Sequence, residues 1–241
     1  MRVRYAPRMI DGLRREVMRF LLRAAWSRGG AADTIDGLPR LHGKDAGPFV
    51  ERLRPADVVL MGNNGRLTHV AVYVGDGAIV HAMATEKTMR GWMMALWDAL
   101  RGLFRLHEPH VGVVEEPLAA FLERFERDTI AAVRHRRVTA ENTARALAHV
   151  RSLVGRPYDY LFARRDDAFY CTELVEEVWN AALGAGAVAL PTRRVRVPLL
   201  LDRDVIEPEV VLGVPDTDVV AANRAALVRY AAAAGTAPIT P

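Results

Sequence analysis

The sequence predicts an α+β fold with a small central antiparallel sheet. Short apolar runs of strand length gather in the middle of the chain, and Gly75-Asp76-Gly77 joins two of them as a β-hairpin. Segments with helical periodicity lie towards both ends of the sequence, such as the amphipathic residues 8–27. A few central strands with helices towards both ends are typical of α+β proteins. The 241 residues are enough to bury a full core.

The remaining elements follow from local patterns. Thr139-Ala140-Glu141-Asn142 opens an Ala-rich helix that ends before Gly155, because a capping side chain and a following glycine mark the two ends of a helix. We expect an N-terminal helix and loop over residues 1–50, a central domain over 51–215, and a C-terminal helix and tail over 216–241. Further strands are expected over residues 53–61, 68–74, 78–82, 111–114, 195–201 and 205–211 and around Val133, and further helices over 86–106, 118–127, 174–183 and from 216 to about 234.

Composition limits the classes of partner and compartment. The formal net charge is +4, but the arginines are scattered among acidic residues without an aromatic-basic motif, so we expect no nucleic-acid partner. The apolar runs are too short to span a bilayer, and charged residues interrupt the N-terminus where a signal core would lie. We therefore expect a cytoplasmic protein. Contact of the basic helix 8–27 with the inner face of the membrane is the alternative to its packing on the core.

Cys171 lies where an apolar run turns into a predicted helix, and it is the only cysteine of the chain, so no intrachain disulfide can form. The N–H groups and dipole at the start of a helix favour a thiolate, which is the nucleophilic form of cysteine. His69 and His81 stand on the predicted hairpin and are candidates for the base that such a nucleophile needs. The alternative is that Cys171 is a small buried apolar residue.

The register of the hairpin decides whether the two imidazoles share a face. With a two-residue loop, His81 would stand opposite Val72 and point away from His69. With the three-residue loop Gly75-Asp76-Gly77, His81 stands opposite Ala71, and His69 becomes its diagonal neighbour on the same face. We predict this second register, in which the last glycine of the loop supplies the left-handed conformation. His69 can then act as the base and His81 as the group that orients it.

Four segments together resemble motifs of the NlpC-type papain-like cysteine peptidases and amidases. The hairpin of His69 and His81 resembles the strands that carry the base and the polar third member of the triad, and residues 53–60 resemble the strand before them. Residues 155–160 resemble a Tyr-containing segment, and residues 170–175 resemble the nucleophile helix. Because the cysteine follows the histidines here, the resemblance is to the circularly permuted branch, the YiiX-like proteins.

This resemblance implies a permuted papain-like fold, with the nucleophile at the N-terminus of a helix and a catalytic domain over residues 51–215. It assigns Cys171 as nucleophile and His69 as general base, with His81 orienting the base. The hydroxyl of Tyr158 and the N–H of Cys171 form the implied oxyanion site. The chain departs from the usual motifs at Ala56 for Gly, Thr172 for Ser and His81 for Glu.

The implied activity is hydrolysis of amide bonds in peptide or N-acyl amino-acid substrates through a thioester acyl-enzyme. We expect no cofactor, because this chemistry needs none, and no metal site, because Pro109 interrupts the His-rich residues 107–110 and a third ligand is not evident. A lipid-directed acyltransferase or thioesterase on the same triad is the first alternative, prompted by the aromatic, Met-rich face from Trp92 to Phe104. The second alternative is a binding module without catalysis. The sequence does not fix the oligomeric state or the amide that is cut.

Overall fold

The structure is a computed structural model that describes residues 12–21, 41–63, 65–84, 111–125, 127–164, 167–197 and 201–223. Its centre is a six-stranded, antiparallel sheet with the strand order β4-β3-β2-β1-β5-β8. The strands are β1 (Val58–Asn63), β2 (Arg66–Gly75), β3 (Ala78–Met83), β4 (Gly112–Pro117), β5 (Thr129–His135) and β8 (Thr217–Ala222).

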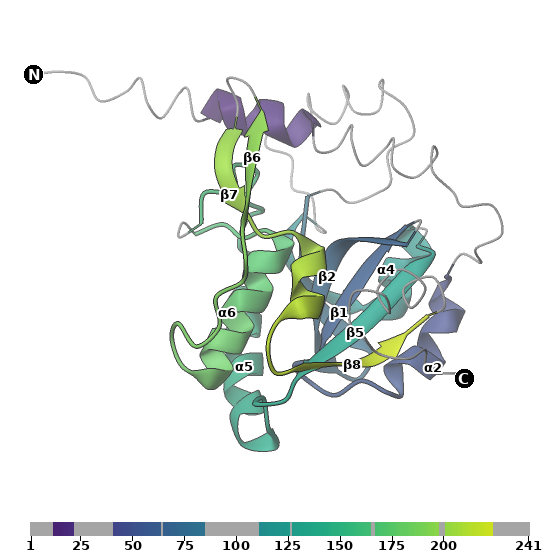
Figure 1. The fold of residues 1–241 in the computed structure, drawn as a ribbon. Helices are drawn as coiled ribbons and strands as arrows, with labels where there is room; N and C mark the ends of the chain where they lie inside the picture. Colours follow the sequence, from purple (N-terminus) through teal and green to yellow (C-terminus); the bar gives the residue numbers. More distant parts are fainter. Residues whose placement is uncertain are drawn as a thin grey trace, which may run out of the picture.

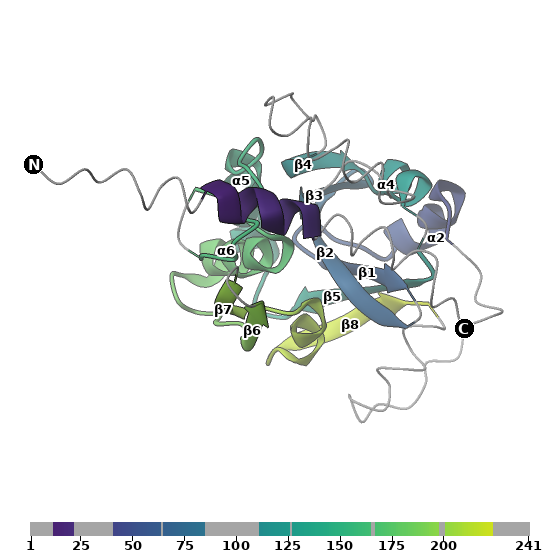
Figure 2. The same cartoon turned by 90° about the horizontal axis from the view of Figure 1, so that it is seen from above.

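Helices cover both faces of this sheet, and a separate two-stranded ribbon stands at one end (Figure 1). The long helices α5 (Ala140–Ser152) and α6 (Cys171–Leu183) pack side by side on one face, and α4 (Leu118–Arg124) packs on the other. Residues 12–21 form a helix beside the ribbon, as two perpendicular views show (Figures 1 and 2). The other elements are η1 (Gly43–Asp45), α2 (Ala46–Val50), β6 (Arg193–Val197), β7 (Leu201–Val205) and η2 (Pro208–Gly213).

The middle strands contribute to two apolar clusters, one on each face of the sheet. Val70 and Val72 of β2 pack with α5 and α6, whereas Ala71 and Tyr73 pack with α4. Six consecutive residues of β2 are therefore buried, and the sequence reads as a continuous apolar run instead of an alternating one. This explains why His69 stands out: it is a polar side chain in a strand that is buried on both faces.

The histidine hairpin has the predicted register, although its loop is built differently. Asp76 and Gly77 form a two-residue turn with φ values of +52° and +73°. An irregularity between Tyr73 and Gly75 adds one residue to β2, so that Val72 faces Val80 and His81 lies opposite Ala71. The bulge and the short turn together restore the register of a three-residue loop, and both imidazoles lie on one face.

Both long helices begin where the sequence predicts. Thr139 and Asn142 form a reciprocal capping box at the start of α5, and Gly155 follows its end with a φ of +89°. Tyr170 caps α6, so that Cys171 is its first residue. The fold is thus α+β, with the predicted nucleophile at a helix N-terminus.

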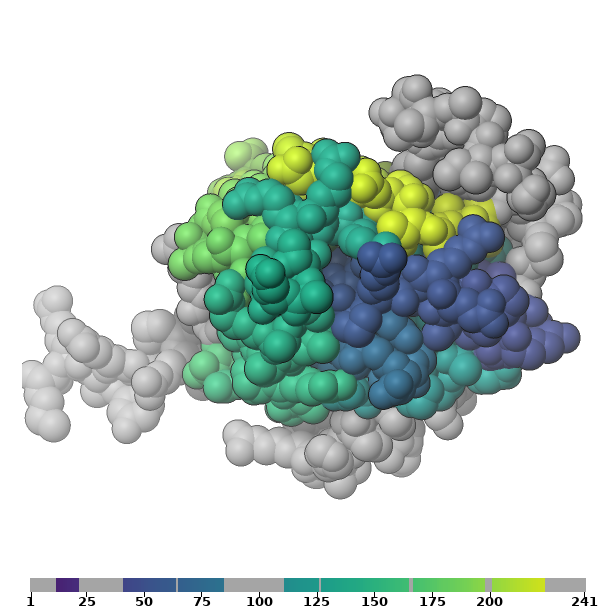
Figure 3. All heavy atoms as spheres, turned by 90° about the horizontal axis from the view of Figure 1, so that it is seen from below, coloured from purple at the N-terminus to yellow at the C-terminus, as the bar shows by residue number. Residues whose placement is uncertain are grey.

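Two predictions near the C-terminus are wrong. The helix predicted from residue 216 is the strand β8 over Thr217–Ala222, which pairs with β5 as the edge of the sheet. The residues at this end of the described chain are seen in yellow at the surface of the molecule (Figure 3). Pairing with β5 overrides the helical propensity of the alanines in this segment. Of the strand predicted over residues 205–211, only Val205 lies in a strand, as the last residue of β7, and Pro208, which supplies no N–H for a ladder, begins the 3₁₀ helix η2.

The helix predicted over residues 86–106, with its aromatic face from Trp92 to Phe104, lies outside the described residues, as do the parts of the helix 8–27 that flank residues 12–21. None of the helices in the described ranges combines the length and the apolar character that a membrane crossing requires.

Gly112 allows the start of β4 to lie close to the backbone of Arg156. This contact positions the segment that leads to Tyr158. The φ of Gly112 is +95°, and a methyl group added there would lie 2.4 Å from the carbonyl oxygen of Arg156. That carbonyl accepts a 2.8 Å hydrogen bond from the N–H of Val113. We expect Gly112→Ala to lower the free energy of unfolding by about 3 kcal/mol, because the substitution adds a backbone clash to an unfavourable φ.

Gly77→Ala is the matched control for this prediction in urea denaturation. Gly77 also has a positive φ, of +73°, but a methyl group there would meet no atom within 4 Å. Gly77→Ala should therefore lower the free energy of unfolding only by the cost of a positive φ for alanine, about 1 kcal/mol. Equal losses in the two variants would show that the contact with Arg156 is not tight.

Candidate active site

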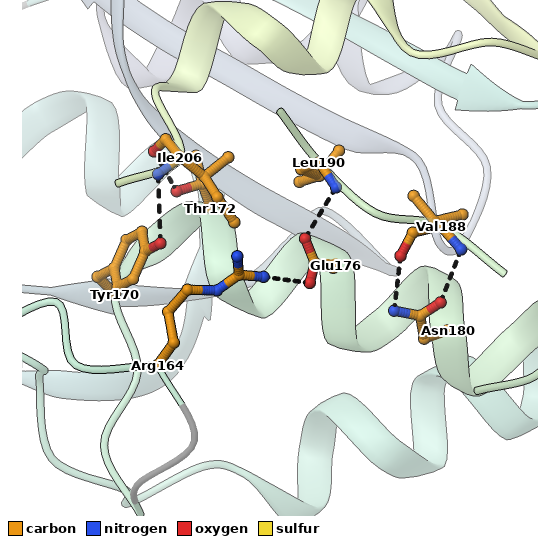
Figure 4. A network of polar contacts seen from close by, with 8 residues as sticks. All are labelled: Arg164, Tyr170, Thr172, Glu176, Asn180, Val188, Leu190 and Ile206. Atoms are coloured by element: carbon orange, nitrogen blue, oxygen red, sulfur yellow. Dashed lines mark hydrogen bonds and ion pairs between the residues drawn. The ribbon is translucent and has the colours of Figure 1, made fainter. Parts of the chain in front are cut away.

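The N-terminus of α6 is held in place by side-chain hydrogen bonds on both sides of Cys171 (Figure 4). The hydroxyl of Thr172 donates to the carbonyl of Ile206 at 2.7 Å, and the N–H of Ile206 donates to the hydroxyl of Tyr170 at 3.3 Å. One turn further along, Glu176 accepts from the N–H of Leu190 at 2.9 Å. These contacts anchor the helix to the segments that follow it, so the position of Cys171 is fixed by its two neighbours.

Cys171 is partly exposed and lies beside the strand of His69. Its side chain packs against the apolar cluster on the α5 and α6 face, and its sulfur receives hydrogen bonds from the backbone N–H groups of Val70, Thr172 and Cys171 itself. Burial of the sulfur raises the pKa of Cys171 to about 11, although these N–H groups act in the opposite direction. The expectation that the helix start alone makes a thiolate is therefore wrong, and activation of Cys171 requires a base.

His69, His81 and Glu116 form a continuous chain of buried polar side chains. Nε2 of His69 lies 2.8 Å from Nδ1 of His81, and Nε2 of His81 lies 2.8 Å from Oε1 of Glu116. Arg124 donates to the same carboxylate oxygen from α4. Phe121 closes the chain on the α4 side, with its ring stacked on His69 and edge-on to His81, at centroid distances of 5.5 and 5.2 Å.

The charges along this chain fix where its protons lie. Burial raises the pKa of Glu116, but the hydrogen bond and charge of His81 and the charge of Arg124 outweigh it, so that the pKa is lowered and the carboxylate is ionised. An ionised Glu116 is an acceptor, so His81 carries its proton on Nε2 and presents the lone pair of Nδ1 to His69. His69 then donates from Nε2, and its own lone pair is on Nδ1.

His69 is a neutral imidazole in this environment. Burial, the charge of His81 and the charge of Arg127 all lower its pKa well below the ordinary value of 6.5. Arg127 is itself buried and lies over the rings of Phe121 and Phe125, at 5.7 and 5.5 Å from their centroids. The base form of His69 is therefore present at neutral pH.

Tyr158 lies next to Cys171, as the oxyanion assignment requires. It forms an isolated parallel bridge with Phe169, two residues before Cys171. Burial raises the pKa of Tyr158 well above its ordinary value, and the charge of Cys171 adds to this shift. Tyr158 is thus protonated at neutral pH, and its hydroxyl is able to donate a hydrogen bond.

The structure joins the predicted residues in two groups. His69 and His81 are hydrogen-bonded and contact Phe121 of α4, whereas Cys171 and Tyr158 pack with the cluster on the α5 and α6 face. The two groups adjoin β2 at consecutive residues, because the backbone of Val70 contacts the sulfur. Their cooperation as one catalytic triad stays a prediction.

Sequence reasoning missed Glu116 and Arg124. Glu116 belongs to β4, where Val114 pairs with His81, so its side chain reaches the second histidine from two residues along the neighbouring strand. The signal in the sequence is a carboxylate within the strand of Val113 and Val114, but its meaning depends on which strand pairs with β3. That pairing joins residues more than thirty positions apart and has no local signature.

No group of three or more His, Cys, Asp or Glu side chains in the described residues is placed to bind a metal ion. The side chains of His69, His81 and Glu116 bind one another in a line and do not converge on a common centre. The His-rich residues 107–110 lie outside the described ranges.

Comparison with known proteins identifies the family to which this fold belongs. The chain belongs to the permuted papain-like amidase enzymes of the YaeF/YiiX C92 family, whose model matches residues 54–221. It is an enzyme of the papain-like cysteine peptidase and amidase class. Among solved structures, it resembles the one titled metalloprotein YiiX from Escherichia coli O157:H7, with a TM-score of 0.51 and 18% identity over 71% of this chain and 98% of that one. Comparison with curated proteins gives no match.

Two buried histidines predict acid sensitivity. Burial is the main cause of the lowered pKa of His69 and also of His135, which lies edge-on to Trp179. Both bind a proton near pH 6.5 in the unfolded chain but stay neutral in the folded one, so the unfolded state binds more protons just below that pH. We expect the free energy of unfolding to fall as pH decreases from 6.5, by up to about 1.4 kcal/mol per pH unit for each group.

Urea denaturation at pH 7.5, 6.5 and 5.5 measures this slope. His135→Phe should make this slope shallower, because it removes one of the two buried imidazoles. A free energy of unfolding that is constant over this range would contradict the prediction.

Proposed function

We propose that the protein hydrolyses amide bonds of peptide or N-acyl amino-acid substrates through a thioester acyl-enzyme, with Cys171 as nucleophile, His69 as general base and His81 as its orienting partner. The observation that carries this proposal is the His69–His81–Glu116 chain, which begins one residue from the backbone that contacts the Cys171 sulfur. Ordered imidazoles of this kind can orient a base and define the nitrogen on which it accepts a proton.

In the proposed first half-reaction, the thiol proton passes to Nδ1 of His69 while the sulfur attacks the substrate carbonyl carbon. The developing oxyanion accepts hydrogen bonds from the N–H of Cys171 and the hydroxyl of Tyr158. His69 then gives the proton to the leaving amine, and a thioester remains. Water attacks the thioester with His69 again as base, which releases the acid and restores the thiol.

Two electrostatic features support a concerted proton transfer. With a pKa of about 11, the thiol of Cys171 is protonated at neutral pH, and the low pKa of His69 keeps the imidazole neutral. The resting pair is therefore neutral, and charge separates only as the substrate reacts. Glu116 stabilises the imidazolium that forms, because its charge is relayed through the hydrogen bonds of His81.

Trapping of the acyl-enzyme tests this proposal. The protein is mixed with N-acyl amino-acid amides and short peptides, quenched in acid and analysed by mass spectrometry. We expect an added mass equal to the acyl group on the peptide that contains Cys171, removable by hydroxylamine at neutral pH as a thioester. Absence of both this adduct and hydrolysis across the panel would overturn the proposal.

The proposed reaction uses the side chains of the chain itself, without a cofactor. The donor set of the described site does not fit a metal ion, because each of its imidazole and carboxylate groups is bound to the next. Dialysis against a chelator is expected to leave the rate of hydrolysis unchanged.

A lipid-derived acyl group is the second candidate substrate, for an acyltransferase or thioesterase on the same residues. The helix over residues 12–21 favours it, since Leu13 is 68% exposed and Leu21 is 39% exposed beside Arg14 and Arg15. This helix would also provide peripheral contact with the cytoplasmic face of a membrane. Sedimentation with anionic vesicles, compared with neutral ones, tests it: no difference between the two vesicles removes the support for the lipid substrate.

A further inference from the structure

The helix over residues 12–21 lies outside the region that matches the family, yet it is anchored close to the proposed active site. Met18 is only 4% exposed and is buried with Ala84, Tyr160 and Leu201. Leu13, in contrast, points to solvent from the same helix. The N-terminal helix therefore meets the rest of the molecule through one buried apolar side chain in the middle of its length.

The aromatic ring of Tyr160 connects this anchor to Cys171. Tyr160 lies 4.9 Å from Tyr158 between ring centroids, and the guanidinium of Arg19 lies 5.9 Å from the Tyr160 centroid on the other side. The hydroxyl of Tyr160 donates to the carbonyl of Ala84 at 2.8 Å, which fixes the ring. Tyr158 in turn is the electrostatic neighbour of Cys171.

Tyr158 and Phe162 pack against both apolar clusters, the one that contains Met18 and the one against which Cys171 lies. Both are partly exposed. Beyond these two rings lies the buried cluster of Met18, Ala84, Tyr160 and Leu201, with the guanidinium of Arg19 over the ring of Tyr160.

We propose that the N-terminal helix forms one wall of the substrate site and that Met18 sets the length of the apolar group accepted beyond Tyr158. The inference rests on the proposed role of Cys171 as the reacting group. It adds a specificity-determining residue from a segment that the family match, over residues 54–221, does not include.

Alkylation of Cys171, the single cysteine, tests whether the N-terminal helix lines the substrate site. The experiment does not require the protein to hydrolyse a substrate. The rates at which N-methylmaleimide and N-octylmaleimide modify the full-length protein are compared, and their ratio reports how well an apolar chain is accommodated next to Cys171. Met18→Ala should raise the octyl-to-methyl ratio by about fourfold for each additional CH₂ that becomes buried. Met18→Gln, which keeps the length of the side chain, should lower it. Leu13→Ala is the matched control on the same helix and should not change the ratio.

Three outcomes are distinguishable. Shifts of the ratio in opposite directions for Met18→Ala and Met18→Gln support the wall, and near-ultraviolet circular dichroism verifies that each variant is folded. Equal acceleration of both maleimides would show that the helix only covers the cysteine, and unchanged rates would place Met18 outside the site; either result overturns the proposal. Because alkylation needs no hydrolysis, these results are independent of the acyl-enzyme experiment, whose failure would remove the enzymatic role alone.

Discussion

Cys171→Ala is expected to lower kcat for amide hydrolysis by about 10⁴-fold or more, because it removes the atom that forms the acyl-enzyme. The substitution replaces a sulfur by a hydrogen at a partly exposed position, so the fold should remain intact. Cys171→Ser should also be severely impaired, since a serine hydroxyl has a higher pKa and is a weaker nucleophile in a site built for a thiol. Steady-state kinetics on the best substrate of the acyl-enzyme panel provide the measurement.

The chain offers an internal control, because Cys171 is its only cysteine. Stoichiometric alkylation of the wild-type protein should abolish activity in parallel with the loss of one titratable thiol. Urea denaturation of Cys171→Ala must show a cooperative transition like that of the wild type. A folded Cys171→Ala variant that retains the wild-type rate would contradict the nucleophile assignment and favour a binding module or a different reacting group.

The fold could be predicted largely because its main signals are local. The turn at Asp76 and Gly77, the caps of α5 and the start of α6 at Cys171 each depend on a few neighbouring residues. The wrong predictions concern segments whose structure is decided by distant partners. The alanines of β8 have helical propensity, and only pairing with β5 makes that segment a strand.

The distinction between local signals and contacts with distant segments also applies to the candidate site. The shared face of His69 and His81 follows from hairpin register, which the short turn and the adjacent bulge in β2 set together within a few residues. Glu116 and Arg124 come from β4 and α4, whose positions depend on strand order and helix packing. The pKa of Cys171 also depends on packing, because it is burial by surrounding elements that outweighs the favourable helix terminus. Sequence alone therefore indicated the candidate residues of the site but not their electrostatic state.

Glu116→Gln tests that electrostatic state, since it keeps the shape of the side chain and removes its charge. A glutamine keeps its amide oxygen towards Arg124 and Nε2 of His81, because both groups donate to the same oxygen of Glu116. The tautomers of the two imidazoles then stay as they are, but the negative charge that stabilises an imidazolium on His69 is lost. We expect kcat to fall by about 10²-fold, as when one electrostatic partner of the developing charge is removed.

Glu115→Gln is the matched control, because Glu115 precedes Glu116 on the same strand but is exposed and paired with Arg151 at 3.3 Å. It should leave kcat unchanged. Nitrogen-15 shifts of the imidazoles separate the loss of charge from a rearrangement of the site: Nε2 of both His69 and His81 should be protonated in the wild type and in Glu116→Gln alike. If Glu116→Gln were as active as Glu115→Gln, the charge of Glu116 would not stabilise the base during the reaction.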